Sequence, residues 1–268
     1  CDLDAAAAGV AAGIFANAGQ VCNAGSRLVV DRKIKDDLLA RIVKHAAAIK
    51  IGDPFDASTK LGPLVSKEQH ERVLGYIDAG RKAGASVLPG GGRPSGKGDG
   101  YFVEPTIFDG VRNDMKIAQE EIFGPVMSIL KFKDVDEGIE RGNRTMYGPA
   151  AAVWTKDISK AIRLSNSLRA GTVWVNCFDV FDASAPFGGF KMSGIGRELG
   201  QYALQLYTEV KTVTVKAHDR DLVSVAVAKR DGIEWEAVIE LRPNGVYTFE
   251  ALAEDVAGNV EKTPATAK

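Results

Sequence analysis

The sequence predicts an α/β domain with a largely parallel sheet over residues 1–216, followed by a small all-β segment over residues 217–268. Through the first part, short apolar runs alternate with segments of helical periodicity, a pattern typical of βα units. Beyond residue 217 the strand-like runs continue, but segments with helical spacing stop. The 268 residues are 45% apolar and 26% charged, a balance typical of globular chains with one large core or two ordinary ones.

The first half of the domain contains the clearest alternation of elements. An Ala-rich run carries the larger apolar residues Val10 and Ile14 four positions apart, which favours a helix packed closely on its neighbours. Ser66 precedes another run of helical spacing and predicts an N-cap with the start of a capping box. The elements expected here are a helix over 5–16, a strand over 26–30, a helix over 34–49, a helix over 68–82 and a strand over 85–88.

The second half continues the alternation after a glycine-rich segment over residues 90–100. Within that segment, Gly91 to Gly98 nearly matches a phosphate-binding loop, but Gly98 stands where the Ser or Thr that binds magnesium is needed. No apolar run leads directly into it either, so a surface loop is the favoured interpretation. The elements expected beyond it are strands over 126–132 and 148–154, a helix over 157–168 and a strand over 172–176.

The C-terminal part of the chain carries strand-like runs and turn signals. Residues 209–216 alternate polar and apolar side chains, and residues 218–221 form a charged stretch that we expect to be a linker. Further strands are expected over 222–228, 234–241 and 246–253. The last of these runs resembles the closing strands of bacterial immunoglobulin-like repeats, although about fifty residues is short for a complete sandwich.

One cysteine follows the first predicted helix among small and polar residues. Cys22 lies between Ala18-Gly19 and Ala24-Gly25, which leave room for a substrate carbonyl to reach the sulfur. Backbone N–H groups can turn toward such a site, and a thiol there reacts as its thiolate. From the spacing alone, a nucleophile and a buried structural cysteine are both open interpretations.

Four blocks of residues resemble the aldehyde dehydrogenase superfamily, in that family's order and at roughly its spacing. The first block is Phe-x-x-x-Gly-Gln-x-Cys-x-Ala-Gly-Ser-Arg over residues 15–27. The others are QEEIFGPV over 119–126, GTVWVN over 171–176 and PFGGFKMSG over 186–194. The resemblance runs from about Cys1 to about Lys216 and is closest to the broad-specificity group that oxidises aliphatic, aromatic and retinal-type aldehydes. It implies an aldehyde-dehydrogenase-like catalytic domain.

The resemblance also implies a reaction and the residues that perform it. In that family a cysteine thiolate attacks the aldehyde, hydride passes to a nicotinamide, and water activated by a glutamate hydrolyses the thioester. The matching residues of this chain are Cys22 as the nucleophile, Glu198 as a second glutamate near the thiol, Glu121 and Phe123 as cofactor-binding residues, and Phe181 and Phe187 as substrate-tunnel residues. NAD or NADP is the implied cofactor.

Several of these residues have an ordinary interpretation when the family is set aside. Glu121 follows Glu120, and such an acidic pair at a helix end is commonly a solvated face. Phe181 and Phe187 are equally compatible with core packing. Cys177 follows a buried-looking strand and is expected to be a packing residue.

The family's dinucleotide-binding domain, oxyanion-hole asparagine and general-base glutamate lie upstream of the point where this chain begins. We therefore expect a truncated chain that corresponds to the catalytic half, with exposed apolar surface that leads to aggregation or association. Three functions remain open. They are the catalytic half of an NAD(P)-dependent aldehyde dehydrogenase, a cofactor-independent thiol esterase remnant, and a non-catalytic interaction protein.

Charge and composition narrow the partners to a small aldehyde substrate. The 34 basic side chains balance 35 acidic ones, which leaves no electrostatic footprint for nucleic acid or a membrane surface. His45, His70 and His218 lie far apart without metal-ligand spacing, so no metal is expected. Three cysteines favour a reducing, cytoplasmic location over a disulfide framework. The resemblance implies homo-oligomers or a separate dinucleotide-binding half, because the family's strand matching residues 209–216 extends a sheet across a subunit interface.

Overall fold

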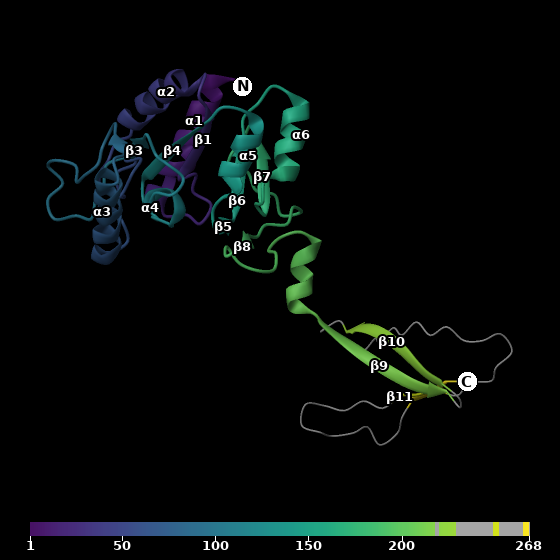
Figure 1. Ribbon diagram of the computed structural model, residues 1–268. Coiled ribbons are helices and arrows are strands. Elements are labelled where there is room, and N and C mark those ends of the chain that lie inside the picture. Colours follow the sequence, from purple (N-terminus) through teal and green to yellow (C-terminus); the bar gives the residue numbers. More distant parts are fainter. Residues whose placement is uncertain (218–219, 229–248, 252–264, 268) are drawn as a thin grey trace. The chain divides into compact units, whose positions relative to one another are not determined.

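The computed structural model describes residues 1–217, 220–228, 249–251 and 265–267 (Figure 1). The chain divides into two compact units, Cys1–Gln201 and Tyr202–Lys268. The first unit holds the α/β part of the chain, and the second holds short strands. No helix in the described ranges is long and apolar enough to cross a membrane.

A four-stranded mixed sheet forms the centre of the first unit. Its strands lie in the order β1 (Arg27–Asp31), β4 (Val126–Phe132), β3 (Thr106–Asp109) and β2 (Ser86–Val87). β1 and β3 run parallel to β4, whereas β2 runs antiparallel to β3. The expectation of a largely parallel sheet is therefore only partly correct. The chain passes from β2 to β3 through the glycine-rich loop, which contains no crossover helix to make the two strands parallel.

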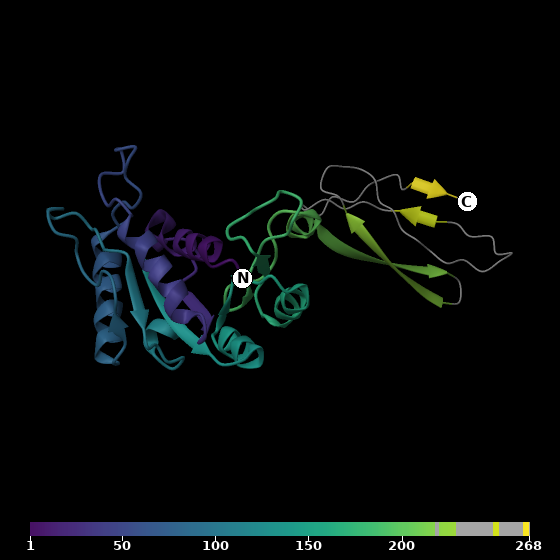
Figure 2. The same cartoon turned by 90° about the horizontal axis from the view of Figure 1, so that it is seen from above.

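Helices cover both faces of this sheet (Figures 1 and 2). They are α1 (Leu3–Phe15), α2 (Lys35–Ala47) and α3 (Lys67–Lys82). Val126 and Leu130 of β4 belong to the core that includes α3, whereas Met127 and Ile129 belong to the core that includes α1 and α2. Successive side chains of a strand point to opposite faces, so a strand buried on both faces is apolar throughout. The continuous apolar run of β4 follows from this burial.

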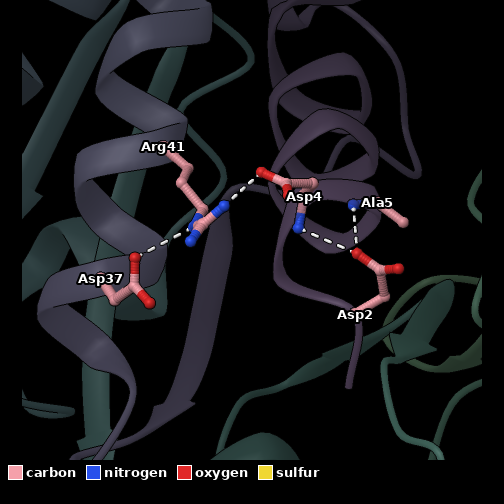
Figure 3. Close-up of polar contacts among 5 residues, drawn as sticks. All are labelled: Asp2, Asp4, Ala5, Asp37 and Arg41. Atoms are coloured by element: carbon pink, nitrogen blue, oxygen red, sulfur yellow. Dashed lines mark hydrogen bonds and ion pairs between the residues drawn. The ribbon is translucent and has the colours of Figure 1, made fainter.

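Polar contacts join the exposed surfaces of α1 and α2 (Figure 3). Asp2 caps α1, because its Oδ1 accepts hydrogen bonds from the N–H groups of Asp4 and Ala5, each at 3.1 Å. The Ala5 N–H is the largest cause of a lowered pKa of Asp2. Arg41 of α2 donates to Asp37 Oδ1 at 3.0 Å and also pairs with Asp4 of α1. One guanidinium thus links the two helices that lie on the same face of the sheet.

Two pairs of short strands follow the sheet in the sequence. They are β5 (Tyr147–Gly148) antiparallel to β8 (Phe190–Lys191), and β6 (Ala150–Val153) parallel to β7 (Thr172–Val175). The strand expected over 148–154 is therefore interrupted. Pro149 separates β5 from β6, because proline has no N–H to donate to a strand ladder.

The remaining helices of the first unit are α4 (Lys116–Gln119), α5 (Val135–Asn143) and α6 (Ile158–Ser167). α4 and α5 lie where the sequence patterns predict no helix. Asp134 starts α5, since its Oδ1 accepts from the Glu137 N–H at 3.0 Å, and this cap is a sequence signal that periodicity alone misses. The other helices and strands expected before residue 201 are confirmed, with ends within two residues of the expected ones.

The second unit contains strands that are described in part. A 3₁₀ helix over Gln201–Tyr207 precedes them. The strands are β9 (Glu209–Ala217) antiparallel to β10 (Arg220–Ala228), and β11 (Phe249–Ala251) antiparallel to β12 (Ala265–Ala267). The strands expected over 209–216 and 222–228 are confirmed. The linker expected over 218–221 is wrong at Arg220 and Asp221, because both residues pair with β9 in the ladder.

Most of the expected immunoglobulin-like module lies outside the described residues. The strand expected over 234–241 falls there entirely, and so does most of the run expected over 246–253. The boundary expected after residue 216 falls inside β9, whereas the compact units divide after Gln201.

Candidate active site

Cys22 lies in a tight loop between α1 and β1. The chain leaves α1 through a 3₁₀ turn in which Asn17, Ala18 and Gly19 have φ angles of 48°, 54° and 69°. Left-handed backbone costs a non-glycine residue about 1–2 kcal/mol, and such conformations gather at functional sites. Three of them in succession turn the chain sharply, and the Cys22 side chain that follows is exposed.

Two contacts anchor the far side of this loop. Asn23 is buried, and its Nδ2 donates to Asp179 Oδ1 at 2.7 Å. The Gly25 N–H donates to Gly13 O of α1 at 2.9 Å. The Phe178 ring lies against both glycines, at 3.6 Å from a Cβ built on Gly25. The loop is therefore fixed to α1 and to the segment that follows β7.

The backbone N–H of Cys22 is free to bind a substrate oxygen. The neighbouring N–H groups of Gln20 and Ala24 donate to Asn17 O and Val21 O, each closing a turn. Within the described part of the chain, the Cys22 N–H donates to no acceptor. A fixed donor beside a nucleophile can stabilise the negative charge that develops on a carbonyl oxygen during attack.

The QEEIFGPV block meets the cysteine block at a contact between two glycines. A Cβ built on Gly19 would lie 2.1 Å from Gly124 O, so the two backbones touch only because residue 19 has no side chain. Gly124 follows Phe123, which is left-handed with a φ of 57°. This contact places the loop of Cys22 directly against the segment that contains Glu121.

Glu121 and Phe123 lie on a short segment held by its backbone. The Glu121 side chain is exposed, and its carboxylate makes no hydrogen bond or ion pair with a described residue. Phe123 is half-buried. Gln69 of α3 donates through Nε2 to the carbonyls of Ile122 and Phe123 at 3.0 and 2.8 Å. Ser66 caps α3 as predicted, but this amide nitrogen reaches the neighbouring segment, so the capping-box interpretation holds only for the serine.

Aromatic side chains form a row beside the cysteine loop. Ring centroids lie 5.0 Å apart for Trp174 and Phe178, 5.7 Å for Trp174 and Phe181, and 5.0 Å for Phe181 and Phe187. Trp174 is buried, whereas Phe181 is 49% exposed. Because Phe178 also contacts Gly25, the row begins at the loop of the nucleophile and ends at an open surface.

Glu198 is joined to the same row through its backbone. Its N–H donates to Phe187 O, and the Phe187 N–H donates to Glu198 O, both at 2.7 Å. The Glu198 side chain is exposed, and the next residue, Leu199, has a φ of 59°. Among the described contacts, none joins the Glu198 carboxylate to Cys22.

Two of the four blocks also meet at the end of α5. Arg27 donates to Arg141 O and Gly142 O at 2.7 and 3.2 Å, and Lys191 donates through Nζ to Asn143 O at 2.8 Å. Burial lowers the pKa of both cations. The carbonyls at a helix C-terminus carry partial negative charge and stabilise nearby cations. The cysteine block and the PFGGFKMSG block therefore share one anchoring point.

Cys177 and His70 have ordinary structural roles. Cys177 is half-buried just beyond β7, in agreement with packing. His70 is buried in α3, and its Nε2 lies 3.2 Å from Phe102 O. Across the described ranges, no group of three or more His, Cys, Asp or Glu side chains could hold a metal ion.

A cavity of about 350 Å³ lies away from these residues. It is lined by Arg112, Asn113, Asp114, Glu137, Glu140, Arg141 and Arg144. Arg141 pairs with Glu137 at 2.7 Å and Arg112 with Asp114 at 3.2 Å. Because these charges compensate one another, the cavity offers no clear preference for an ionic ligand.

A comparison with protein families decides the assignment, since the model of the aldehyde dehydrogenase family matches residues 1–213. The chain belongs to the aldehyde dehydrogenase family. It is 53% identical to the mitochondrial aldehyde dehydrogenase of Homo sapiens over 220 residues, which are 82% of this chain and 42% of that protein. It is 53% identical to aldehyde dehydrogenase 1A1 of Gallus gallus over 215 residues, which are 80% of this chain and 42% of that protein. This aldehyde dehydrogenase chain thus spans about two fifths of the length of these relatives.

Solved structures of aldehyde dehydrogenases share the fold. An NAD+ complex of the enzyme from Bacillus cereus matches with a TM-score of 0.77 and 52% identity, over 80% of this chain and 43% of that one. An indole-3-acetaldehyde dehydrogenase in complex with NAD+ matches with a TM-score of 0.77 and 50% identity, over 81% and 44%. The aldehyde-dehydrogenase-like α/β fold expected from the four blocks is confirmed.

Proposed function

We propose that this aldehyde dehydrogenase chain oxidises an aldehyde to a carboxylic acid, with Cys22 as the nucleophile and NAD or NADP as the hydride acceptor. One observation carries the proposal. An exposed thiol with a free backbone N–H lies in a loop that touches the segment of Glu121 and Phe123. The NAD+ complexes of similar enzymes support the same cofactor for this chain.

Cys22 performs the covalent step. Its thiolate adds to the carbonyl carbon of the aldehyde, a C–S bond forms, and the electron pair of the C=O bond moves to the oxygen. The Cys22 N–H donates to this oxygen, and one such donor is worth about 3 kcal/mol in other acyl-transfer enzymes. Hydrolysis of the resulting thioester then releases the acid and returns the thiol.

Glu121 and Phe123 are the residues of this chain that fit the nicotinamide end of the cofactor. The unpaired Glu121 carboxylate can accept two ribose hydroxyls, and the half-buried Phe123 ring offers an aromatic face beside the thiol loop. When bound, the cofactor supplies the hydride acceptor. Both residues lie on backbone that is fixed before any ligand arrives.

Phe181, Phe187 and Glu198 form the substrate side of the proposed site. The aromatic pair offers an apolar wall suited to aliphatic and aromatic aldehydes, which supports broad specificity. Glu198 is paired with Phe187, and its exposed carboxylate is proposed to relay protons.

Association, location and the C-terminal segment complete the proposal. Exposed apolar side chains at Ile158, Ile162, Met192 and Ile195 support association with a second copy or with a dinucleotide-binding half. Sizing of the purified chain tests this, because a monodisperse monomer contradicts it. We further propose that residues 1–216 act as the catalytic domain in the cytoplasm and that 217–268 form an immunoglobulin-like module. The human relative is named mitochondrial, so cell fractionation decides the location.

The test of the proposed activity measures NADH and ester cleavage in parallel. The purified chain is given an aldehyde with NAD, followed by absorbance of NADH, and an activated ester, followed by alcohol release. We expect both activities in the parent and in Cys22→Ala we expect neither, whereas Cys177→Ala retains both. Ester cleavage without NADH formation replaces the proposal with a thiol esterase, and activity that persists in Cys22→Ala removes Cys22 as the nucleophile.

A further inference from the structure

Three successive backbone carbonyls in the QEEIFGPV block accept hydrogen bonds from side chains of one helix. Gln69 Nε2 donates to Ile122 O at 3.0 Å and to Phe123 O at 2.8 Å. Arg72 donates through Nη2 to Glu121 O at 2.8 Å. Gln69 and Arg72 are three residues apart on α3, so they lie on the same face of the helix. We call Gln69 and Arg72 the carbonyl clamp.

The segment needs such a clamp because its backbone is not part of a helix or strand. Phe123 has a φ of 57°, a conformation that a non-glycine residue keeps only when its surroundings impose it. Carbonyls that turn away from regular structure must find other donors when they are buried. The two N–H groups of one glutamine amide supply donors to two adjacent carbonyls and thereby fix the peptide that joins them.

The clamp is itself held on a rigid support. Ser66 Oγ accepts from the Gln69 N–H at 3.2 Å and fixes the first turn of α3. Val73, one residue beyond Arg72, is fully buried and lies against Gly124, where a built Cβ would be 2.6 Å from the valine side chain. The backbone of residues 121–124 is thus held along its whole length by the first two turns of α3.

The same end of α3 also contacts the cysteine loop. The Val65 N–H, just before the Ser66 cap, donates to Gln20 Oε1 at 2.9 Å. Gly124 in turn touches Gly19 on that loop. The distance between the thiol and the segment of Glu121 and Phe123 is therefore set by a single helix terminus.

We propose that Gln69 is a positioning residue for the cofactor, which acts by holding the peptide between Ile122 and Phe123, with Arg72 in a supporting role. This inference rests on the proposed function, since Glu121 and Phe123 are the groups that Gln69 aims. In this arrangement the Gln69 amide nitrogen is fully used by carbonyls. Its contribution to cofactor binding passes through the neighbouring backbone.

The experiment measures hydrogen exchange of residues 120–126 by mass spectrometry, together with the Kd of NAD. The variants are Gln69→Leu and Gln69→Glu, which keep the size of the side chain but lose its N–H donors. Glu71→Leu is the control, because residue 71 lies on the same turn and is exposed. Removing two hydrogen bonds predicts exchange that is about 10- to 30-fold faster and NAD binding that is about 5- to 20-fold weaker in both Gln69 variants.

A double-mutant cycle separates positioning from direct contact. If Gln69 acts through the segment of Glu121, then Gln69→Leu has little further effect on the Kd of NAD in a Glu121→Ala background. Independent, additive effects overturn the proposal, and so does unchanged exchange of residues 120–126 in both Gln69 variants. If the parent chain binds no NAD, the proposed function fails, while the exchange measurement still decides whether the clamp exists.

Discussion

Replacement of Gly19 by alanine tests the contact that joins the cysteine loop to the QEEIFGPV block. Gly19 has a φ of 69°, and a Cβ at this position would lie 2.1 Å from Gly124 O and 2.4 Å from the Gly124 carbonyl carbon. Real carbon–oxygen contacts rarely come below about 3 Å, so one of the two backbones must move by roughly 1 Å. Neither atom belongs to a flexible side chain that can turn away.

Two contributions add to the expected loss of stability. A left-handed backbone costs alanine about 1–2 kcal/mol relative to glycine. Overpacking of a tight contact costs about 1–3 kcal/mol more. We expect Gly19→Ala to lower the free energy of unfolding by roughly 2–5 kcal/mol, a large part of the total for an ordinary domain.

Gly96 supplies a matched control for the backbone term. Its φ of 71° is almost the same, but a built Cβ meets no atom within 4 Å. Gly96→Ala should therefore show the left-handed cost without the steric cost. The difference between the two variants, measured by urea denaturation, gives the steric contribution alone, which we expect to be about 1–3 kcal/mol.

The rate of Cys22 alkylation by iodoacetamide provides a second, local measurement under native conditions. Displacement of the loop changes the surroundings of the thiol, so the rate should change in Gly19→Ala and stay unchanged in Gly96→Ala. Equal destabilisation by both variants, within about 0.5 kcal/mol, together with equal alkylation rates, would refute the view that the two blocks are in contact.

Three further measurements test the support around the sheet. Lys35→Met leaves the half-buried Asp109 without its partner at 2.5 Å and should lower stability by about 1–3 kcal/mol, and adding Asp109→Asn should restore part of the loss. Burial raises the pKa of Asp109, but the Lys35 hydrogen bond outweighs it and the pKa is lowered. This contribution is therefore present above about pH 4 and disappears as the pH falls further, and acid unfolding of Lys35→Met should lack it. Tyr76→Phe removes the donor to Glu120 Oε2 at 2.7 Å and should cost about 0.5–1.5 kcal/mol by urea denaturation, whereas no loss contradicts that bond.

Local patterns were sufficient to predict most of the fold. The alternation in β4, the cap at Ser66 and the cap at Asp157 each arise from residues close together in the sequence, and the structure contains all three elements. The direction of β2 depends on how the chain returns after a glycine-rich loop, and loop composition does not encode that path. Pro149 was the visible sign that a long apolar run is two strands.

The residues around the proposed site divide in the same way. Cys22, Glu121 and Phe187 stand in recognisable blocks of sequence, and the structure brings the first two blocks together through Gly19. Asn23 and Gln69 carry no such signal, because each acts on a segment far away in the sequence. An asparagine or glutamine reveals this role only when its partner is known. Sequence patterns thus found the reacting groups and missed the residues that hold them.

The bond between Asn23 and Asp179 has a consequence for how the protein is made. The two residues are 156 positions apart, and Arg27 reaches its acceptor on Gly142 across 115 positions. A ribosome exposes the cysteine early but delivers these anchors only after most of the domain has emerged. Contacts of such long range form late, since the intervening chain must first be ordered. An incomplete nascent chain therefore carries the sulfur without the geometry that would make it a nucleophile.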